Sequence, residues 1–220
     1  MQYKSVKQLI RPLIKSGHEW QFISINGKVT KPKFYFSNIQ WIILIISSLL
    51  LFKLNRGISK DIIGYVMAAF SISVSLFMSL LVSIFDKFEN TQFETSEKTD
   101  EEIKRLIQKK NFFKRFISIT SYLVILSIFI IILCSLTYTF NLSNRDLHIQ
   151  TFTLDFSLID ISLTIKNSLL IIYRIALNYF LLNYLFLTFF ITGSAYEYYM
   201  SELDRRKILT EIPEDGESNT

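Results

Sequence analysis

Residues 62–85 read IIGYVMAAFSISVSLFMSLLVSIF, twenty-four residues without a charged side chain between Asp61 and Asp86. The hydrocarbon core of a bilayer is about 30 Å thick, and a helix needs roughly 20 apolar residues to cross it. Only a helix or a closed barrel satisfies its own backbone hydrogen bonds in lipid. This stretch therefore predicts a transmembrane helix, and it predicts that the chain is an integral membrane protein.

The same stretch carries a row of small residues spaced three or four apart. They are Gly64, Ala68, Ser71, Ser75, Ser79 and Ser83. With 3.6 residues per turn, these positions follow one slightly coiling face of the helix. Such rows let helix backbones approach closely in lipid, where little hydrophobic force drives association. We predict that this small-residue row packs against a neighbouring helix or another subunit. The more specific alternative is a hydroxyl-lined pore.

The composition agrees with a membrane protein. Half of the 220 residues are hydrophobic, and the mean hydropathy is +0.32. The net charge of +5 belongs to segments that flank the apolar stretches, so we expect it to reflect membrane topology and not direct nucleic-acid binding. Cys134 is the single cysteine, which excludes an intrachain disulfide.

Four apolar windows predict an all-α membrane domain over residues 34–196. The predicted spans cover about residues 35–53, 62–85, 116–140 and 168–196. Residues 86–115, between the second and third spans, are densely charged. Thr99 and Glu102 have the spacing of a capping box, which predicts a helix that leads into the third span.

Residues 1–33 contain two local patterns. Apolar residues from Val6 to Ile14 recur at helical spacing beside Lys and Arg, which predicts a basic amphipathic helix in the lipid headgroup layer. Pro12 opposes this, because proline inside a helix removes a hydrogen bond; a frayed terminus is the alternative. Asn26-Gly27 separates two runs that contain aromatic and β-branched residues, and it predicts a hairpin.

Positive charge orients the spans. Residues 1–33, 86–115 and the charged tail 197–220 hold eighteen Lys and Arg, against five on the other side of the membrane. Cytoplasmic loops are enriched in Lys and Arg, so we expect both termini in the cytoplasm. Residues 141–167 would then be extracytoplasmic. Their alternating apolar residues predict two short strands or one bulged strand.

Arg174 and Asn178 share one face of the fourth span. An ionisable residue at membrane depth is a functional candidate because burying its charge is costly; alternatively, Arg174 extends to the interface. No phosphate-binding loop or nucleophile motif is present. His18 and His148 are predicted on opposite sides of the membrane. We therefore predict no catalytic residue, no metal, no cofactor and no enzymatic activity.

Residues 35–140 carry a resemblance. Its features are Gly64-Tyr65, the run from Ala69 to Phe77, the exit Asp86-Lys87-Phe88 and the charged helix leading into the third span. This layout resembles small membrane effectors of bacterial antiphage systems, most nearly the membrane protein encoded beside the reverse transcriptase of a retron. The resemblance implies an inner-membrane protein that a reverse transcriptase and its DNA-RNA product hold inactive. Infection would release it to damage the membrane and kill the cell.

The resulting hypothesis is an oligomeric effector of abortive infection. The small-residue row would pack the subunits, residues 86–115 would receive the trigger, and opening would dissipate the membrane potential. Two alternatives stay open. One is a membrane sensor or anchor subunit without pore activity, and the other is a small constitutive channel.

Overall fold

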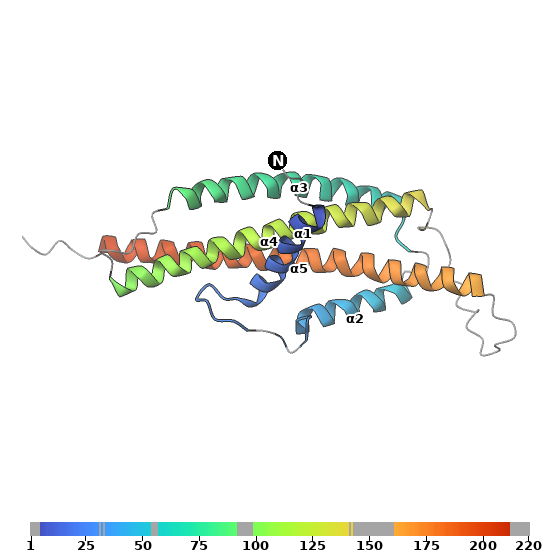
Figure 1. Cartoon of the computed structure of the whole chain (residues 1–220), viewed down its shortest axis with the longest axis horizontal. Helices are drawn as coiled ribbons and strands as arrows, with labels where there is room; N and C mark the ends of the chain where they lie inside the picture. The colour runs from blue at the N-terminus through green and yellow to red at the C-terminus, as the bar shows by residue number, and fades with distance from the viewer. Residues whose placement is uncertain are drawn as a thin grey trace, which may run out of the picture.

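The computed structural model describes residues 5–30, 32, 34–53, 57–91, 99–140, 142 and 161–211. These residues are almost entirely helical. The helices are α1 (Val6–Glu19), the 3-10 helix η1 (Trp20–Phe22), α2 (Asn38–Lys53), α3 (Lys60–Glu89), α4 (Asp100–Thr139) and α5 (Ile161–Glu211). Figure 1 shows α3, α4 and α5 running side by side along the long axis, with α2 beside α5 and α1 crossing in front.

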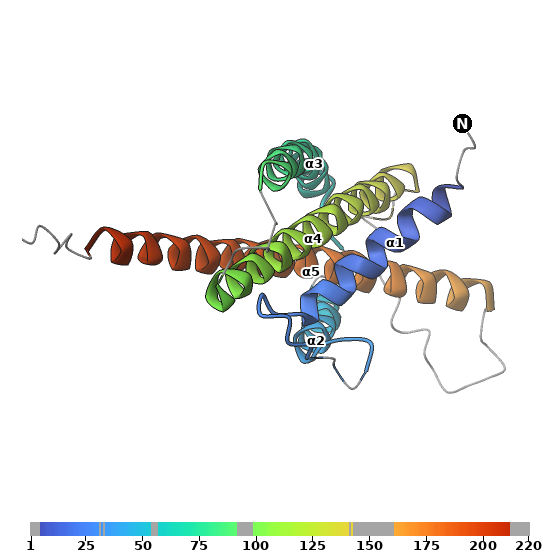
Figure 2. The ribbon, with the colours of Figure 1, turned by 60° about the vertical axis from the view of Figure 1, so that its left-hand side comes forward.

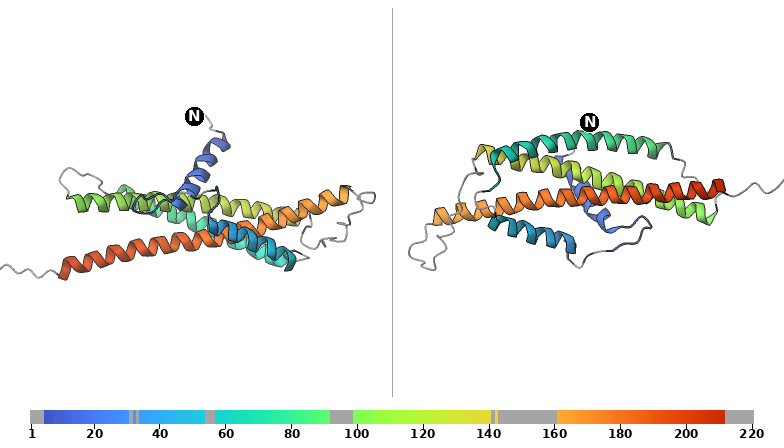
Figure 3. Two further views of the ribbon diagram at one scale, coloured as in Figure 1. Left: turned by 90° about the horizontal axis from the view of Figure 1, so that it is seen from below. Right: turned by 180° about the vertical axis from the view of Figure 1, so that it is seen from behind.

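Three of the described helices, α3, α4 and α5, are long and apolar enough to cross a membrane. The helices α3, α4, α5 and α2 follow one another as an open row of neighbours, which Figure 3 shows from two further sides. Helix α4 lies in the middle of the three long helices. In their most apolar stretches, 44% of the residues are buried in α4 and 33% in α5, but only 11% in α3. Most of α3 therefore faces away from the rest of the chain.

Local capping explains where α3 and α4 begin. The Ser59 side chain accepts a hydrogen bond from the Ile62 backbone N–H, and Asp61 lies in the positively polarised first turn of α3. Thr99 and Glu102 form the predicted capping box, with the Thr99 N–H donating to a Glu102 carboxylate oxygen at 2.9 Å. Helix α4 then continues without a break through Arg115 into the apolar stretch. At 1.5 Å per residue its 40 residues extend about 60 Å, well beyond a bilayer core.

The predicted charged segment 86–115 is divided between two helices. Its first four residues end α3, and residues from Asp100 onward begin α4. Residues 92–98 lie outside the described part of the chain. The first part of the predicted tail 197–220 is also not a separate element, because it belongs to α5, which continues to Glu211.

Helix α2 is shorter than the first predicted span. It has 16 residues and is about 24 Å long. It begins only at Asn38, because Ser37 and Gln40 cap each other there. The Ser37 N–H donates to Gln40 Oε1 at 3.0 Å, and the Gln40 N–H donates to Ser37 Oγ at 3.2 Å. The aromatic residues Phe34 to Phe36 precede this cap as non-helical chain. A fourth membrane-crossing helix is therefore not shown by α2 alone.

The N-terminal expectations are met in part. Helix α1 forms with Pro12 inside it, and Pro12 is exposed. The predicted hairpin is reduced, among the described residues, to one antiparallel bridge between Ile23 and Val29. Gly27 has φ +79°, the left-handed conformation that an Asn-Gly turn uses. Most of the strand pattern predicted within 141–167 falls on residues 143–160, outside the described part, and from Ile161 onward the chain is helical.

Candidate functional site

The small-residue row of α3 begins inside the bundle and continues on its outside. Gly64 is half-buried against α4: a Cβ at this position would lie 3.1 Å from the Tyr138 hydroxyl oxygen. That hydroxyl donates to the Lys60 carbonyl oxygen at 2.8 Å. Glycine at position 64 therefore lets the start of α3 lie close to the end of α4.

The other members of the row point away from the chain. Ala68, Ser71, Ser75, Ser79 and Ser83 are all exposed. The Ser71 hydroxyl donates to the Met67 carbonyl oxygen at 2.8 Å, and the Ser79 hydroxyl donates to the Ser75 carbonyl oxygen at 3.1 Å. These hydroxyl protons are satisfied within α3, so the row can enter an apolar environment without leaving a donor unpaired. Within the described residues, Gly64 is the one member of the row that packs against another helix of the same chain.

Large side chains occupy the opposite face of α3. Ile63, Phe70 and Ile84 are buried there, and the ring of Phe70 lies 4.5 Å from that of Tyr184 on α5. The bundle therefore holds α3 through bulky residues. The face best suited to close helix approach in lipid is left open.

Arg174 is buried at the end of the bundle where α3 begins. It is 7% exposed, and its Nη2 donates to the Leu142 carbonyl oxygen at 3.3 Å. Gly57, in the connection before α3, has φ +80°, and a Cβ there would come within 3.0 Å of Nη2. The sequence left two alternatives for Arg174: a functional role at membrane depth, or extension of the side chain to the membrane interface. In the structure, the Arg174 side chain is enclosed by its own chain.

Asn178 lies one turn further along α5 and is also buried. Arg174 and Asn178 both line a small cavity of about 20 Å³, together with Gly57, Ile63 and Tyr173. This volume is enough for about one water molecule. The predicted intramembrane polar pair thus shares one site, which lies apart from the exposed part of the small-residue row.

Further polar residues are buried on α4 and α5, and the sequence analysis did not single them out. Thr120, Ser127, Asn183 and Ser194 are all buried. Asn183 Oδ1 and Thr120 Oγ1 have no hydrogen-bond partner among the described residues. On α5, a pattern in the sequence indicates the packed face. Buried Leu170, Leu177, Tyr184 and Ile191 recur every seven residues, as in packed helices.

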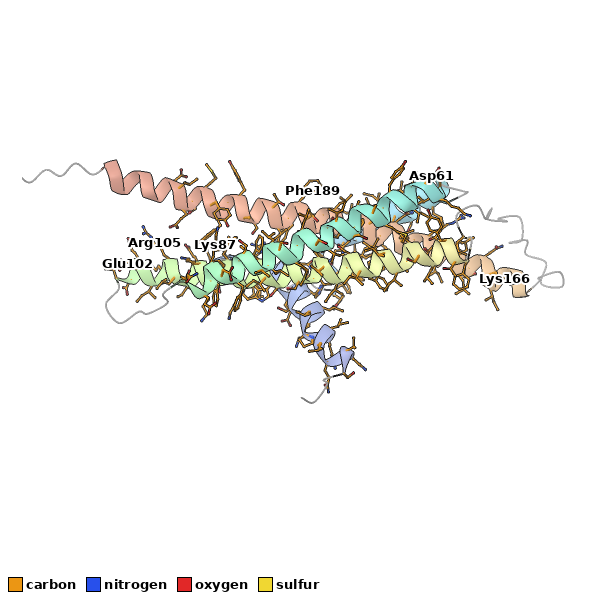
Figure 4. All side chains as sticks on the ribbon, turned by 90° about the horizontal axis from the view of Figure 1, so that it is seen from above. Asp61, Lys87, Glu102, Arg105, Lys166 and Phe189 are labelled. Atoms are coloured by element: carbon orange, nitrogen blue, oxygen red, sulfur yellow. The ribbon has the colours of Figure 1, made fainter. Side chains whose placement is uncertain are left out.

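The charged start of α4, which the sequence analysis predicted to lie in the cytoplasm, packs on the C-terminal part of α5 through aromatic rings. Phe112 stacks on Tyr198 with ring centroids 4.1 Å apart, and the Arg115 guanidinium lies 4.4 Å from the centre of the Phe190 ring. Cation-π contact of this kind stabilises a cation at the edge of an apolar region. Figure 4 shows Lys87, Glu102 and Arg105 at this end of the bundle, and Asp61 and Lys166 at the other.

Among the described residues, no three His, Cys, Asp or Glu side chains are arranged to hold a metal ion. No protein-family model, curated protein or solved structure matches the chain. Over its described residues the fold defines the class: a helical protein in which three of the described helices are long and apolar enough to cross a membrane.

Proposed function

We propose that this chain is a membrane effector of a bacterial antiphage defence system, and that it depolarises the inner membrane on infection to cause abortive infection. The observation that supports this best is the open α3 face. Ser71, Ser75 and Ser79 are exposed along a helix whose bulky side is already packed. A helix of this kind is suited to associate with a second copy of the same chain.

The proposed topology has four crossings with both termini in the cytoplasm. Contacts at the two ends of the bundle support it. Near the N-terminus, Gln108 donates to Asn26 and Asn111 donates to the Ile25 carbonyl oxygen, both from the charged start of α4. After α2, Gly57 lies against Arg174 at the opposite end. Ile25 and Gly57 therefore lie toward opposite ends of the bundle, and among the described residues between them Asn38–Lys53 form a helix.

The continuity of α4 supports a trigger received at its charged start. Because Asp100–Thr139 is one helix, a displacement of its charged end moves the apolar part as well. The partner proposed from the resemblance is a cytoplasmic reverse transcriptase with its DNA-RNA product. Direct nucleic-acid binding by this chain and enzymatic activity are not part of the proposal.

The test is the membrane potential of bacteria that express the chain with its native neighbours, measured by a voltage-sensitive dye before and after phage challenge. Depolarisation only after challenge is expected. The Ser75→Leu/Ser79→Leu variant should insert but not depolarise. Ala69→Leu is the matched control, because Ala69 is small and exposed on α3 but lies off the row.

Other outcomes identify the alternatives. An unchanged potential with the protein present in the membrane would reject pore activity and favour a sensor or anchor. Depolarisation without challenge or neighbours would favour a constitutive channel.

A further inference from the structure

Helix α1 lies across the bundle, and its last turn is fixed to α4. Figure 2 and Figure 4 show it crossing the direction of the long helices. The hydroxyl groups of Ser16 and Ser118 are hydrogen-bonded at 2.7 Å. Gly17 is buried, and a Cβ there would come within 2.9 Å of Tyr122 Cγ. The absence of a side chain at position 17 is thus what allows the contact.

The attachment point lies at the boundary of the apolar part of α4. Arg115 is the last charged residue of α4, and Ser118 is three residues further on, about 5 Å along the helix. Interfacial helices bury their apolar faces about 5–10 Å into the boundary between headgroups and acyl chains. If α4 crosses the bilayer, α1 therefore lies at that depth on the side of the charged start of α4.

The apolar face of α1 extends beyond this contact and is open. Val6, Leu9 and Leu13 are on the same side of the helix as Gly17, and they are 69%, 55% and 40% exposed. Lys7 and Arg11 are exposed on the other side. Each apolar side chain would be costly in water, and each cation would be costly in the acyl region. The boundary between the two suits both.

A groove beside α1 is likewise lined by both apolar and cationic side chains. It has a volume of about 550 Å³. Its lining includes the apolar Ile10 and Ile14, the cations Lys7, Arg11 and Lys15, and also Val6, His18, Glu19 and Tyr35. This volume falls in the range of ligand pockets. The chemistry of the lining matches a phospholipid, whose phosphate pairs with Lys and Arg and whose acyl chain contacts isoleucine.

We infer that α1 and this groove bind anionic phospholipid of the adjacent leaflet. The charge balance supports lipid as the occupant. Lys7, Arg11 and Lys15 are accompanied on α1 by a single acid, Glu19, which pairs with Lys15 at 3.9 Å. A nucleic acid would leave Val6, Leu9 and Leu13 uncovered, whereas a leaflet covers the cations and the apolar residues together. The inference rests on insertion of the bundle and is independent of a role in defence.

The test uses the full-length chain with Cys134→Ala, reconstituted in phosphatidylcholine bilayers with and without phosphatidylglycerol. A spin label at Leu9→Cys reports collisions with oxygen, which partitions into lipid, and with a nickel chelate, which stays in water. In bilayers with phosphatidylglycerol, the label at position 9 is expected to collide mainly with oxygen. A label at Lys7→Cys should collide mainly with nickel.

The Lys7→Glu/Arg11→Glu/Lys15→Glu variant should lose the oxygen preference at position 9. The charge-matched Lys104→Glu/Arg105→Glu/Lys110→Glu variant, altered on exposed positions of α4, should keep it. A label at exposed Ile132 checks that the bundle has inserted in every sample.

Two results would overturn the inference while Ile132 still reports lipid. If position 9 collides with nickel equally in both bilayers, α1 lies in water. If it is shielded from both reagents, a protein surface covers α1, either a second copy or a partner.

Discussion

Gly17 of α1 and Tyr122 of α4 lie in direct contact, with no room between them for a Cβ on residue 17. The Ser118 carbonyl oxygen also lies nearby, 3.1 Å from where that Cβ would be. The two residues are more than a hundred positions apart in sequence. One glycine therefore fixes where the N-terminal helix crosses the bundle.

Gly17→Ala is expected to release α1 from α4. The added methyl group clashes with Tyr122, at a cost of about 1–3 kcal/mol for the contact. Hydrogen exchange of α1 backbone amides should accelerate, while exchange in the middle of α4 stays slow. Gly193→Ala is the control, since a Cβ at Gly193 meets nothing within 4 Å, and helix propensity favours alanine there. Equal exchange in both variants would show that the contact does not hold α1.

Gly57→Ala should destabilise the protein more than Gly27→Ala does. Both glycines have positive φ, so alanine at either position costs roughly 1–2 kcal/mol in backbone strain. Only position 57 also faces a guanidinium at 3.0 Å, whereas at position 27 the nearest atom is Asn111 Nδ2 at 3.4 Å. Thermal unfolding in detergent compares the two. Equal unfolding temperatures would mean that Arg174 moves aside freely.

Acidification should loosen the packing of α1 on Tyr35. The His18 ring stacks on the Tyr35 ring with centroids 4.1 Å apart, and burial lowers the pKa of His18 below its ordinary value. The folded state then binds the proton more weakly than the unfolded state, so this contribution to stability is present above a pH of about 6.5 and is lost as the pH falls.

Proton NMR titration of the His18 ring measures that pKa. His18→Phe keeps an aromatic ring without a titrating group, so it should make the contact independent of pH. A His18 pKa at or above the ordinary value would contradict the prediction.

Copies of the chain should approach one another through the small-residue row. In a Cys134→Ala background, Ser79→Cys is expected to form disulfide-linked dimers when membranes are mildly oxidised, because cysteines on a close helix interface come within bonding distance. Ala69→Cys, exposed off the row, should cross-link several-fold less. The prediction fails if the two variants cross-link to the same extent.

Asn183→Leu is expected to raise the unfolding temperature of the isolated chain. Asn183 is 2% exposed, and its Oδ1 has no hydrogen-bond partner among the described residues. An unsatisfied buried polar atom costs about 1–3 kcal/mol, which a leucine of similar size would remove. Differential scanning calorimetry of detergent-solubilised protein measures the change. A lowered unfolding temperature would instead indicate that Asn183 has a partner in an assembly.

Several features of the fold could be predicted because they depend on neighbouring residues in the sequence. The charge-free run 62–85 predicted an apolar helix, since in lipid a backbone must satisfy itself locally, and α3 contains that run. Thr99 and Glu102, three residues apart, predicted the start of α4. Arg174 and Asn178 were predicted on one face of a helix, and both line the same cavity.

Other features depend on which faces meet, which the sequence alone did not reveal. Periodicity predicted that Ser75 and Ser79 share a face, but only the arrangement of α3 on α4 decided that this face is outward. Gly57 lies between the first two apolar windows, but nothing in the sequence indicated that it would cover Arg174.

The sequence by itself determined the class of this protein: the apolar runs and the caps specify long helices through local hydrogen bonding and hydrophobicity. The tertiary structure alone decided which surfaces are left open. Bulky Phe70 fills the space against Tyr184, so the serines of α3 face outward, and the missing side chain of Gly17 lets α1 lie across α4. Packing of complementary shapes between distant segments made both choices, and no local pattern in the chain encodes them.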